Sequence, residues 1–285
     1  MNVKEEISVQ NEENNYSKQI KIVLLADVHM GHNRSTRPGE EAPFWLRKLV
    51  DEINFEIKPN AFIDLGDRIN DSNREDDRKN AERYFDIIEM VNVPYFFLLG
   101  NHDVHYLSEF ENKKIYRNNA VNLSVKIKGI KFIFINTADP VEENIGGNVS
   151  EKQLEWLKKE LDEENIPKVI FGHHPIDDQD ISGNPHFLSF PHLAFVQNKE
   201  VVRKIVKNGK NVVAYINGHV HWFSFYTDNH LPYFSVPSFI ESWPEKEEAP
   251  GMYVVVTIKE NGECVFELQG INPKRIYGKF LWRFK

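Results

Sequence analysis

Short apolar runs alternate with amphipathic segments along most of the chain. Residues 20–26, apart from Lys21, form an aliphatic and β-branched run, which predicts a buried strand. From 43 to 57 the apolar residues recur at helical spacing, so this segment is predicted to be a helix. A strand at 61–65, a helix at 76–91 and a strand at 95–99 continue the alternation. This order predicts a mostly parallel sheet with helices packed against it.

The second half of the chain has a different pattern. Runs at 121–128 and 130–136 meet at Lys128-Gly129 and predict a β-hairpin. Ser150 is expected to begin a helix, because Gln153 follows it in capping-box register. Strands are predicted at 167–171 and 212–216 around a helix at 198–206, and short strands at 222–226, 231–236, 252–258 and 264–268. The chain therefore reads as an α/β protein with a β-sandwich core.

The composition is that of a globular protein and limits its partners. The 285 residues are 41% hydrophobic and 27% charged, with a formal net charge of −8. No global positive field attracts nucleic acid, although bound cations can still create an anion site inside an acidic protein. The one contrary signal is a basic C-terminus, which is expected to pack on the body or on a partner chain; its members are Lys274, Arg275, Lys279, Arg283 and Lys285.

Other features define the expected compartment and domain limits. Cys264 is the only cysteine, which excludes an internal disulfide and multi-cysteine metal sites. Residues 1–18 are polar, lack a secretory signal and are expected to be a disordered leader. No stretch has the length of a membrane span, so a cytoplasmic protein is expected. The catalytic domain is placed at 19–270 and a C-terminal extension at 271–285, whose role in a homo-oligomer stays open.

Metal-capable side chains follow five of the predicted strands. The clusters are Asp27-Val28-His29, Gly66-Asp67, Gly100-Asn101-His102-Asp103, Gly172-His173-His174-Pro175 and Gly218-His219-Val220-His221. The carboxyl ends of strands are where α/β folds build their sites, and residues two apart on extended backbone share a face. Each block alone is more often a solvated loop or a core histidine, but five in one order favour a site. Carboxylate, amide and imidazole donors suit manganese, iron or zinc better than calcium.

The five blocks in this order resemble the signature of the calcineurin-like metallophosphoesterase superfamily. The G-H-H-P and G-H-V-H forms resemble the branch with cyclic-nucleotide phosphodiesterases, glycerophosphodiesterases and purple-acid-phosphatase-like enzymes. The resemblance implies a four-layer α-β-β-α sandwich of two mixed sheets flanked by helices. It also implies two divalent metal ions (Mn, Fe or Zn) that hydrolyse a phosphate ester through a metal-bridging hydroxide.

The resemblance also implies a role for each motif residue. One metal would take Asp27, His29, Asp67 and His221, and the other would share Asp67 and add Asn101, His173 and His219. His102 would protonate the leaving oxygen, Asp103 would hold the His102 ring, and Asn101, His102 and His174 would contact substrate. For His174, a packing role is an equal alternative.

One block departs from the family pattern, and the substrate is open. Many relatives carry a further carboxylate shortly after the bridging aspartate, where this chain has Arg68, Ile69 and Asn70 before Asp71. Arg68 is interpreted as an exposed loop residue rather than a phosphate contact, and Asn70 and Asp71 as turn residues or helpers of the ligands. The preferred substrate is a small-molecule phosphodiester, of cyclic-nucleotide or glycerophosphodiester type. A phosphomonoester is the alternative, and a non-catalytic protein-binding scaffold is disfavoured because every expected ligand is present.

Overall fold

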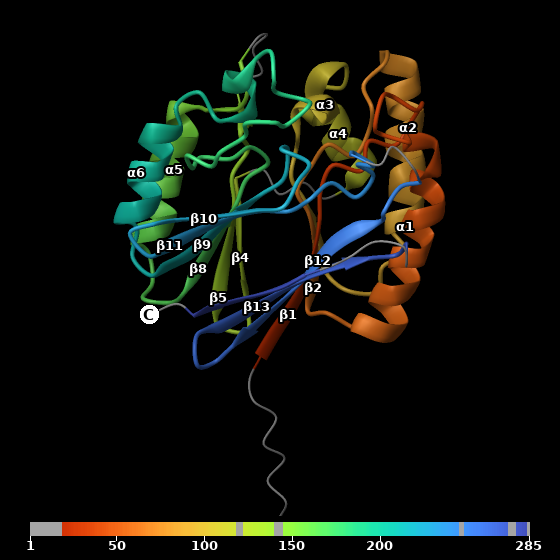
Figure 1. Ribbon diagram of the computed structural model, residues 1–285. Helices are drawn as coiled ribbons and strands as arrows, with labels where there is room; N and C mark the ends of the chain where they lie inside the picture. Colours follow the sequence, from red (N-terminus) through yellow and green to blue (C-terminus); the bar gives the residue numbers. More distant parts are fainter. Residues whose placement is uncertain (1–18, 118–121, 140–144, 245–247, 273–277, 284–285) are drawn as a thin grey trace, which may run out of the picture.

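Two six-stranded sheets form the centre of the protein (Figure 1). The computed structural model describes residues 19–117, 122–139, 145–244, 248–272 and 278–283; the predicted leader and the basic residues 274, 275 and 285 lie outside these ranges. The first sheet contains, in spatial order, β14 (Lys279–Arg283), β13 (Glu263–Gly270), β12 (Met252–Lys259), β1 (Gln19–Leu25), β2 (Ala61–Asp64) and β3 (Tyr95–Phe97). The second contains β10 (Ser224–Asp228), β11 (Leu231–Ser235), β9 (Val212–Asn217), β8 (Lys168–Phe171), β5 (Ile130–Phe134) and β4 (Leu123–Ile127). Each sheet mixes parallel and antiparallel pairs.

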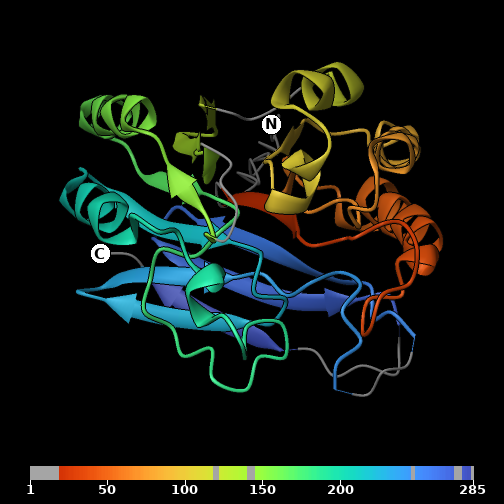
Figure 2. The same cartoon turned by 90° about the horizontal axis from the view of Figure 1, so that it is seen from above.

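Helices cover the outer face of each sheet, as the view from above shows (Figure 2). On one side lie α1 (Ala42–Asp51), α2 (Arg74–Ile88), α3 (Asn101–His105) and α4 (Glu109–Tyr116), and on the other α5 (Glu151–Asp162) and α6 (Lys199–Asn208). Three hydrophobic cores separate the layers, one between the sheets and one under each set of helices. Along β1, for example, Ile22 and Leu24 face the other sheet while Val23 and Leu25 face α1 and α2. The predicted four-layer fold is therefore confirmed.

Several elements begin or end differently from the prediction. The side chain of Asn73 accepts hydrogen bonds from the first turn of α2, so this helix starts at Arg74. The predicted helix at 43–57 continues beyond α1 as a π-helical turn (Glu52–Ile57). The capping box predicted for α5 is absent, because the Ser150 hydroxyl donates to Asp139 and the Gln153 side chain bonds Asn136 instead.

The structure also contains elements that the sequence did not predict, among them α4 and β14. Helix α4 begins in a capping box made by Ser108 and Glu111. Strand β14 lies within the expected C-terminal extension and pairs antiparallel with β13, where Lys279 and Arg283 approach the carboxylates of Glu267 and Glu263. In the described ranges, no helix has both the length and the apolar character to cross a bilayer.

Candidate metal centre

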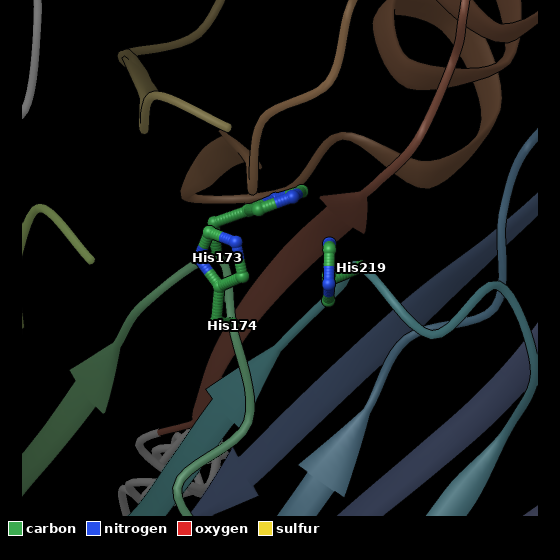
Figure 3. A group of neighbouring side chains, drawn as sticks. All are labelled: His173, His174 and His219. Carbon is green, nitrogen blue, oxygen red and sulfur yellow. The ribbon is translucent and has the colours of Figure 1, made fainter. Parts of the chain in front are cut away.

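Five chain segments bring the predicted ligands to one edge of the two sheets. Each segment leaves the carboxyl end of β1, β2, β3, β8 or β9, and these five ends lie together because the strands run parallel across the middle of the sandwich. Figure 3 shows His173 and His174 after β8 and His219 after β9, with their rings turned toward one another. The predicted convergence of the motif residues is thus seen in the structure.

The backbone at these positions is not extended, which corrects the expectation from spacing. Strands β1 and β9 end before the ligands begin, and five ligand candidates adopt positive φ angles: Asp27 (54°), His29 (44°), Asp67 (57°), His219 (70°) and His221 (64°). Left-handed backbone is costly for residues with a Cβ and collects at functional sites, where surrounding structure enforces it. Asp27 with His29, and His219 with His221, share a pocket because the backbone is left-handed at both members of each pair, and not because of strand pleating.

Glycines make the close approach of these loops possible. A Cβ at Gly100 would lie 2.1 Å from the Asp67 Oδ1 atom, and one at Gly66 would lie 2.5 Å from the Gly100 backbone nitrogen. Gly66 also has a φ of 105°, which side chains rarely tolerate. Glycine at both positions therefore lets the backbone come near the ligand candidates.

Asp27, His29 and His221 form the first donor group. The Nε2 atoms of His29 and His221 are 3.0 Å apart, and His221 Nε2 lies 3.7 Å from Asp27 Oδ1. His221 Nδ1 lies 2.9 Å from Glu241 Oε2, and a carboxylate can only accept, so this nitrogen carries the proton. The lone pair of His221 is consequently on Nε2, the atom that faces the other two donors.

The predicted ligands of the second metal are Asp67, Asn101, His173 and His219, which we call the second donor group; His173 and His219 lie with His174 in one cluster of metal-capable side chains, and Asp67 and His173 lie with Asp27 in another. His173 Nδ1 donates to the Leu65 carbonyl (2.8 Å), and its Nε2, the nitrogen that a cation would use, lies 3.2 Å from Asp67 Oδ2. His219 Nε2 likewise donates to a backbone carbonyl (2.9 Å), which leaves Nδ1 free. Three buried atoms, Asn101 Oδ1, His173 Nε2 and His219 Nδ1, have no hydrogen-bond partner among the described residues.

These unpartnered donors fit a pair of cations. Buried polar atoms without partners are rare, and a group of oxygen and imidazole donors facing one point is what a transition metal requires. Asp67 lies between the groups, since its Oδ2 is also 4.0 Å from His29 Nε2. The residues present therefore match the chemistry of two metal positions sharing one carboxylate.

The protonation states of His29, His219, His221 and Asp67 agree with this assignment, whereas His173 and Asp27 would each release a proton on binding a cation. Against the effect of burial, the Asp67 carboxylate raises the pKa of His173 to about 9, and burial raises the pKa of Asp27 well above its usual value. Burial lowers the pKa of His219 and of His221 to about 3, and it also lowers the pKa of His29, so these rings are neutral at pH 7. Burial opposes ionisation of Asp67, but the charges of His173 and neighbouring histidines outweigh it and hold the pKa of Asp67 well below its usual value. Neutral imidazoles and an ionised carboxylate are the forms that bind metal.

His102 lies at the cleft, but its partner is not the predicted one. The His102 ring is 22% exposed, and its Nδ1 contacts the carboxylate of Asp71. Its backbone N–H donates to Asp67 Oδ1 (2.9 Å), while its Nε2 lies 4.0 Å from Asp67 Oδ2. Asp71, interpreted from sequence as a turn residue or helper, is therefore the group that holds this ring.

Asp103 and Arg68 form a buried pair beneath the site, which corrects both predictions. Asp103 accepts hydrogen bonds from the backbone N–H groups of Asp67 (2.8 Å), Arg68 (3.0 Å) and Gly100 (2.9 Å). The Arg68 side chain is fully buried rather than exposed, and its Nη2 lies 3.2 Å from Asp103 Oδ2. The carboxylate turns toward these backbone groups because they would otherwise be buried without partners. Asp103 therefore supports the loop that carries Asp67.

The cleft above the donors has a volume of about 280 Å³. His174 lines it: Thr137 bonds the His174 Nδ1 (2.8 Å), and its Nε2 has no partner among the described residues. Phe187 and Leu193 also line it, so part of the segment 185–195 borders the site. A larger hollow of about 540 Å³ at the opposite edge contains no group of three metal-capable side chains in the described ranges.

Three residues at the site were missed from the sequence. Glu241 accepts from His221 and also from His186 Nε2 (2.6 Å), and Arg37 lines the cleft beside His29. None belongs to a contiguous motif. The only available signal was their chemistry: a charged or imidazole side chain in a loop near a motif, which is too common to single out.

Comparison with known proteins identifies the family. The sequence model of the calcineurin-like phosphoesterase family matches residues 20–223, and the chain belongs to this family. A protein from Arcobacter nitrofigilis named as a probable glycerophosphodiester phosphodiesterase is 28% identical over 59% of this chain and 59% of its own length. A probable cyclic nucleotide phosphodiesterase from Synechococcus is 24% identical over 49% of this chain and 51% of its own length. The matches thus span only about half to three fifths of these relatives.

The fold is also shared with solved structures. A dimetal phosphatase from Danio rerio superposes with a TM-score of 0.73 at 15% identity, covering 93% of this chain and 99% of that protein. At this identity the likeness establishes the fold alone. It agrees with the four layers of this protein.

Proposed function

We propose that this chain is a phosphoric ester hydrolase that uses two divalent cations and acts on small-molecule phosphodiesters. The observation that carries the proposal is the set of buried, unpartnered donors, Asn101 Oδ1, His173 Nε2 and His219 Nδ1, beside a carboxylate that faces a second donor group. The names of the two relatives, a glycerophosphodiester and a cyclic nucleotide phosphodiesterase, favour a diester.

In this proposal the two donor groups hold one cation each. Asp27, His29 and His221 would hold the first, Asn101, His173 and His219 would hold the second, and Asp67, which lies between the two groups, would serve both; manganese, iron and zinc suit these donors. When bound, the cations would neutralise charge on the phosphoryl oxygens and make water a nucleophile near neutral pH.

The chain's own contribution is orientation and proton transfer. Backbone carbonyls and Glu241 fix the tautomers of His173, His219 and His221, so the ligand nitrogens need no rearrangement. His102 presents Nε2 to the cleft while Asp71 holds Nδ1, which suits it to protonate the leaving alkoxide. Asn101, His102 and His174 line the cleft and are the proposed substrate contacts.

Hydrolysis of a chromogenic phosphodiester and the matching monoester tests this function. The protein is stripped with chelator and assayed after addition of manganese, iron or zinc, with bound metal counted in parallel. We expect two metals per chain, restored activity and a higher kcat/KM for the diester. Asp67→Ala should lose the second metal and activity, whereas Asp51→Ala, at an exposed helix end, should change neither.

The outcomes separate the alternatives. A preference for the monoester would make the protein a phosphatase. Two bound metals without hydrolysis of either ester would leave a scaffold role as the better explanation, and near-normal turnover by Asp67→Ala would refute the metal assignment.

A further inference from the structure

Arg37 carries an unpaired positive charge into the cleft. Its side chain lines the cleft with His102, His174 and other site residues, and its Nε atom is buried without a hydrogen-bond partner in the described ranges. No described carboxylate lies within 4.0 Å of it, whereas the buried Arg68 and Arg203 both have one. The half-buried Arg37 thus differs from Arg68 and Arg203 in lacking a direct ion pair, although the carboxylates of Asp67 and Glu241 act on it from farther away.

The position of Arg37 is fixed by its backbone. Arg34 and Arg37 exchange backbone hydrogen bonds of 2.9 and 2.7 Å, which closes a tight turn. Ser242 donates both its backbone N–H (2.9 Å) and its hydroxyl (2.8 Å) to the Thr36 carbonyl, which anchors the turn to the loop after β11. These hydrogen bonds fix the backbone of Arg37, whose side chain lies at the wall of the cleft.

Its one side-chain neighbour does not satisfy this charge. Arg37 Nη1 lies 3.3 Å from His29 Nδ1. If His29 uses Nε2 as a metal ligand, its Nδ1 carries the proton, so both atoms are donors and cannot bond each other. A guanidinium stays charged, and the carboxylates of Asp67 and Glu241 offset only part of the cost of burial, which on balance lowers the pKa of Arg37. An anionic ligand beside the Arg37 guanidinium would therefore be favourable.

We infer that Arg37 binds an anionic oxygen of the phosphoryl group of the substrate, on the side of the cleft next to His29. The guanidinium offers two or more parallel N–H donors, which match the oxygens of a phosphate. The inference rests on the proposed function, because it takes a phosphate ester as the ligand. Arg37 is then a substrate-binding residue that discriminates against uncharged ligands.

Binding of inorganic phosphate to the metal-loaded protein tests this role without requiring turnover. Arg37→Met removes the charge, Arg37→Lys keeps it but loses the planar fork, and Arg83→Met removes an exposed arginine on α2 as a matched control. We expect Arg37→Met to weaken phosphate binding about tenfold or more in calorimetry, since charge-assisted hydrogen bonds are among the strong ones. Arg37→Lys should lose less, Arg83→Met nothing, and all three should bind two metals.

Two results would overturn the inference. One is phosphate affinity within twofold of the native protein in an Arg37→Met variant that carries both metals. The other is loss of metal in that variant, which would make Arg37 a support for His29 instead. If Arg37→Met does not fold, as judged by circular dichroism, Arg37→Gln replaces it under the same criteria. A native protein that binds metals and phosphate but hydrolyses no ester would contradict the proposed function and leave Arg37 testable.

Discussion

The buried pair of Arg68 and Asp103 should be a large contributor to stability. Arg68 is fully buried; its Nη1 donates to the Leu98 carbonyl (2.6 Å), and its guanidinium lies 4.3 Å from the centroid of the Tyr116 ring. The carboxylates of Asp103 and Asp64 outweigh burial and raise the pKa of Arg68. Replacement by Met fills much of the volume but leaves both carboxylates without their cation.

The magnitude follows from what remains after Arg68→Met. Breaking a buried ion pair typically costs about 3–5 kcal/mol, because one charge stays buried and uncompensated. Asp103 keeps three backbone hydrogen bonds, so we expect the lower end, about 3 kcal/mol. For a chain of this size each kcal/mol shifts Tm by about 2–4 °C, so the melting temperature should fall by about 6–12 °C.

Equilibrium unfolding in guanidinium chloride, with chelator in every sample, measures this loss. The exposed Arg83→Met serves as the charge-matched control and should change the free energy of unfolding by about 0.5 kcal/mol or less. The double variant Arg68→Met with Asp103→Asn should lose less than the sum of the single losses, because the two side chains interact directly. A loss below about 1 kcal/mol for Arg68→Met, or strict additivity, would refute the reasoning.

Three further predictions concern other residues. Glu241→Ala should weaken metal binding about 10- to 100-fold, while Glu241→Gln keeps an acceptor for His221 Nδ1 and should lose less. Calorimetry measures the metal affinity of both variants and of the native protein, and equal affinity in all three would contradict this prediction. Asp71→Asn should slow hydrolysis more for poor leaving groups than for good ones, because it weakens the hold on protonated His102, and an equal loss would count against that role. Burial raises the pKa of Cys264 to about 12, above the ordinary value of about 8.5, so the unfolded thiol ionises first and stability should fall as pH rises above about 8.5. Urea unfolding measures the free energy of unfolding of the native protein and of Cys264→Ala, and the difference between them should fall by at most about 1.4 kcal/mol per pH unit. A difference that does not change with pH would refute this prediction.

The strands that build the fold were predictable because their burial leaves a strong pattern. The run at 20–26 is aliphatic on both faces, since one face of β1 meets the other sheet and the opposite face meets helices. Helix α4 left no such pattern: most of its residues are polar, and its Phe110 is 64% exposed. Strand β14 has only three apolar residues, flanked by Lys279 and Arg283, and lies at a sheet edge, where its pairing depends on a partner strand rather than on its own sequence.

The ligands were predictable for a different reason from the residues that support them. A ligand must follow a strand end closely, so it lies in a short contiguous block such as Gly218–His221. Its supports can come from any loop that the fold brings near: Asp71 reaches His102 across 31 positions, and Glu241 reaches His221 across 20. Only the tertiary structure decides which of many polar loop residues takes that place.

The residues that hold the ligand loops in place also contribute to the energetics of the site. The left-handed backbone at Asp27, Asp67 and His219 costs about 1–3 kcal/mol at each position and persists only where the surroundings enforce it. For Asp67 the enforcing contacts come from Asp103, which binds the Asp67 N–H and is itself neutralised by Arg68. Removing Arg68 should therefore weaken metal binding as well as stability, even though no Arg68 atom needs to touch the cation. A variant that lost stability but kept native metal affinity would show that the Asp67 loop is held by the glycine contacts alone.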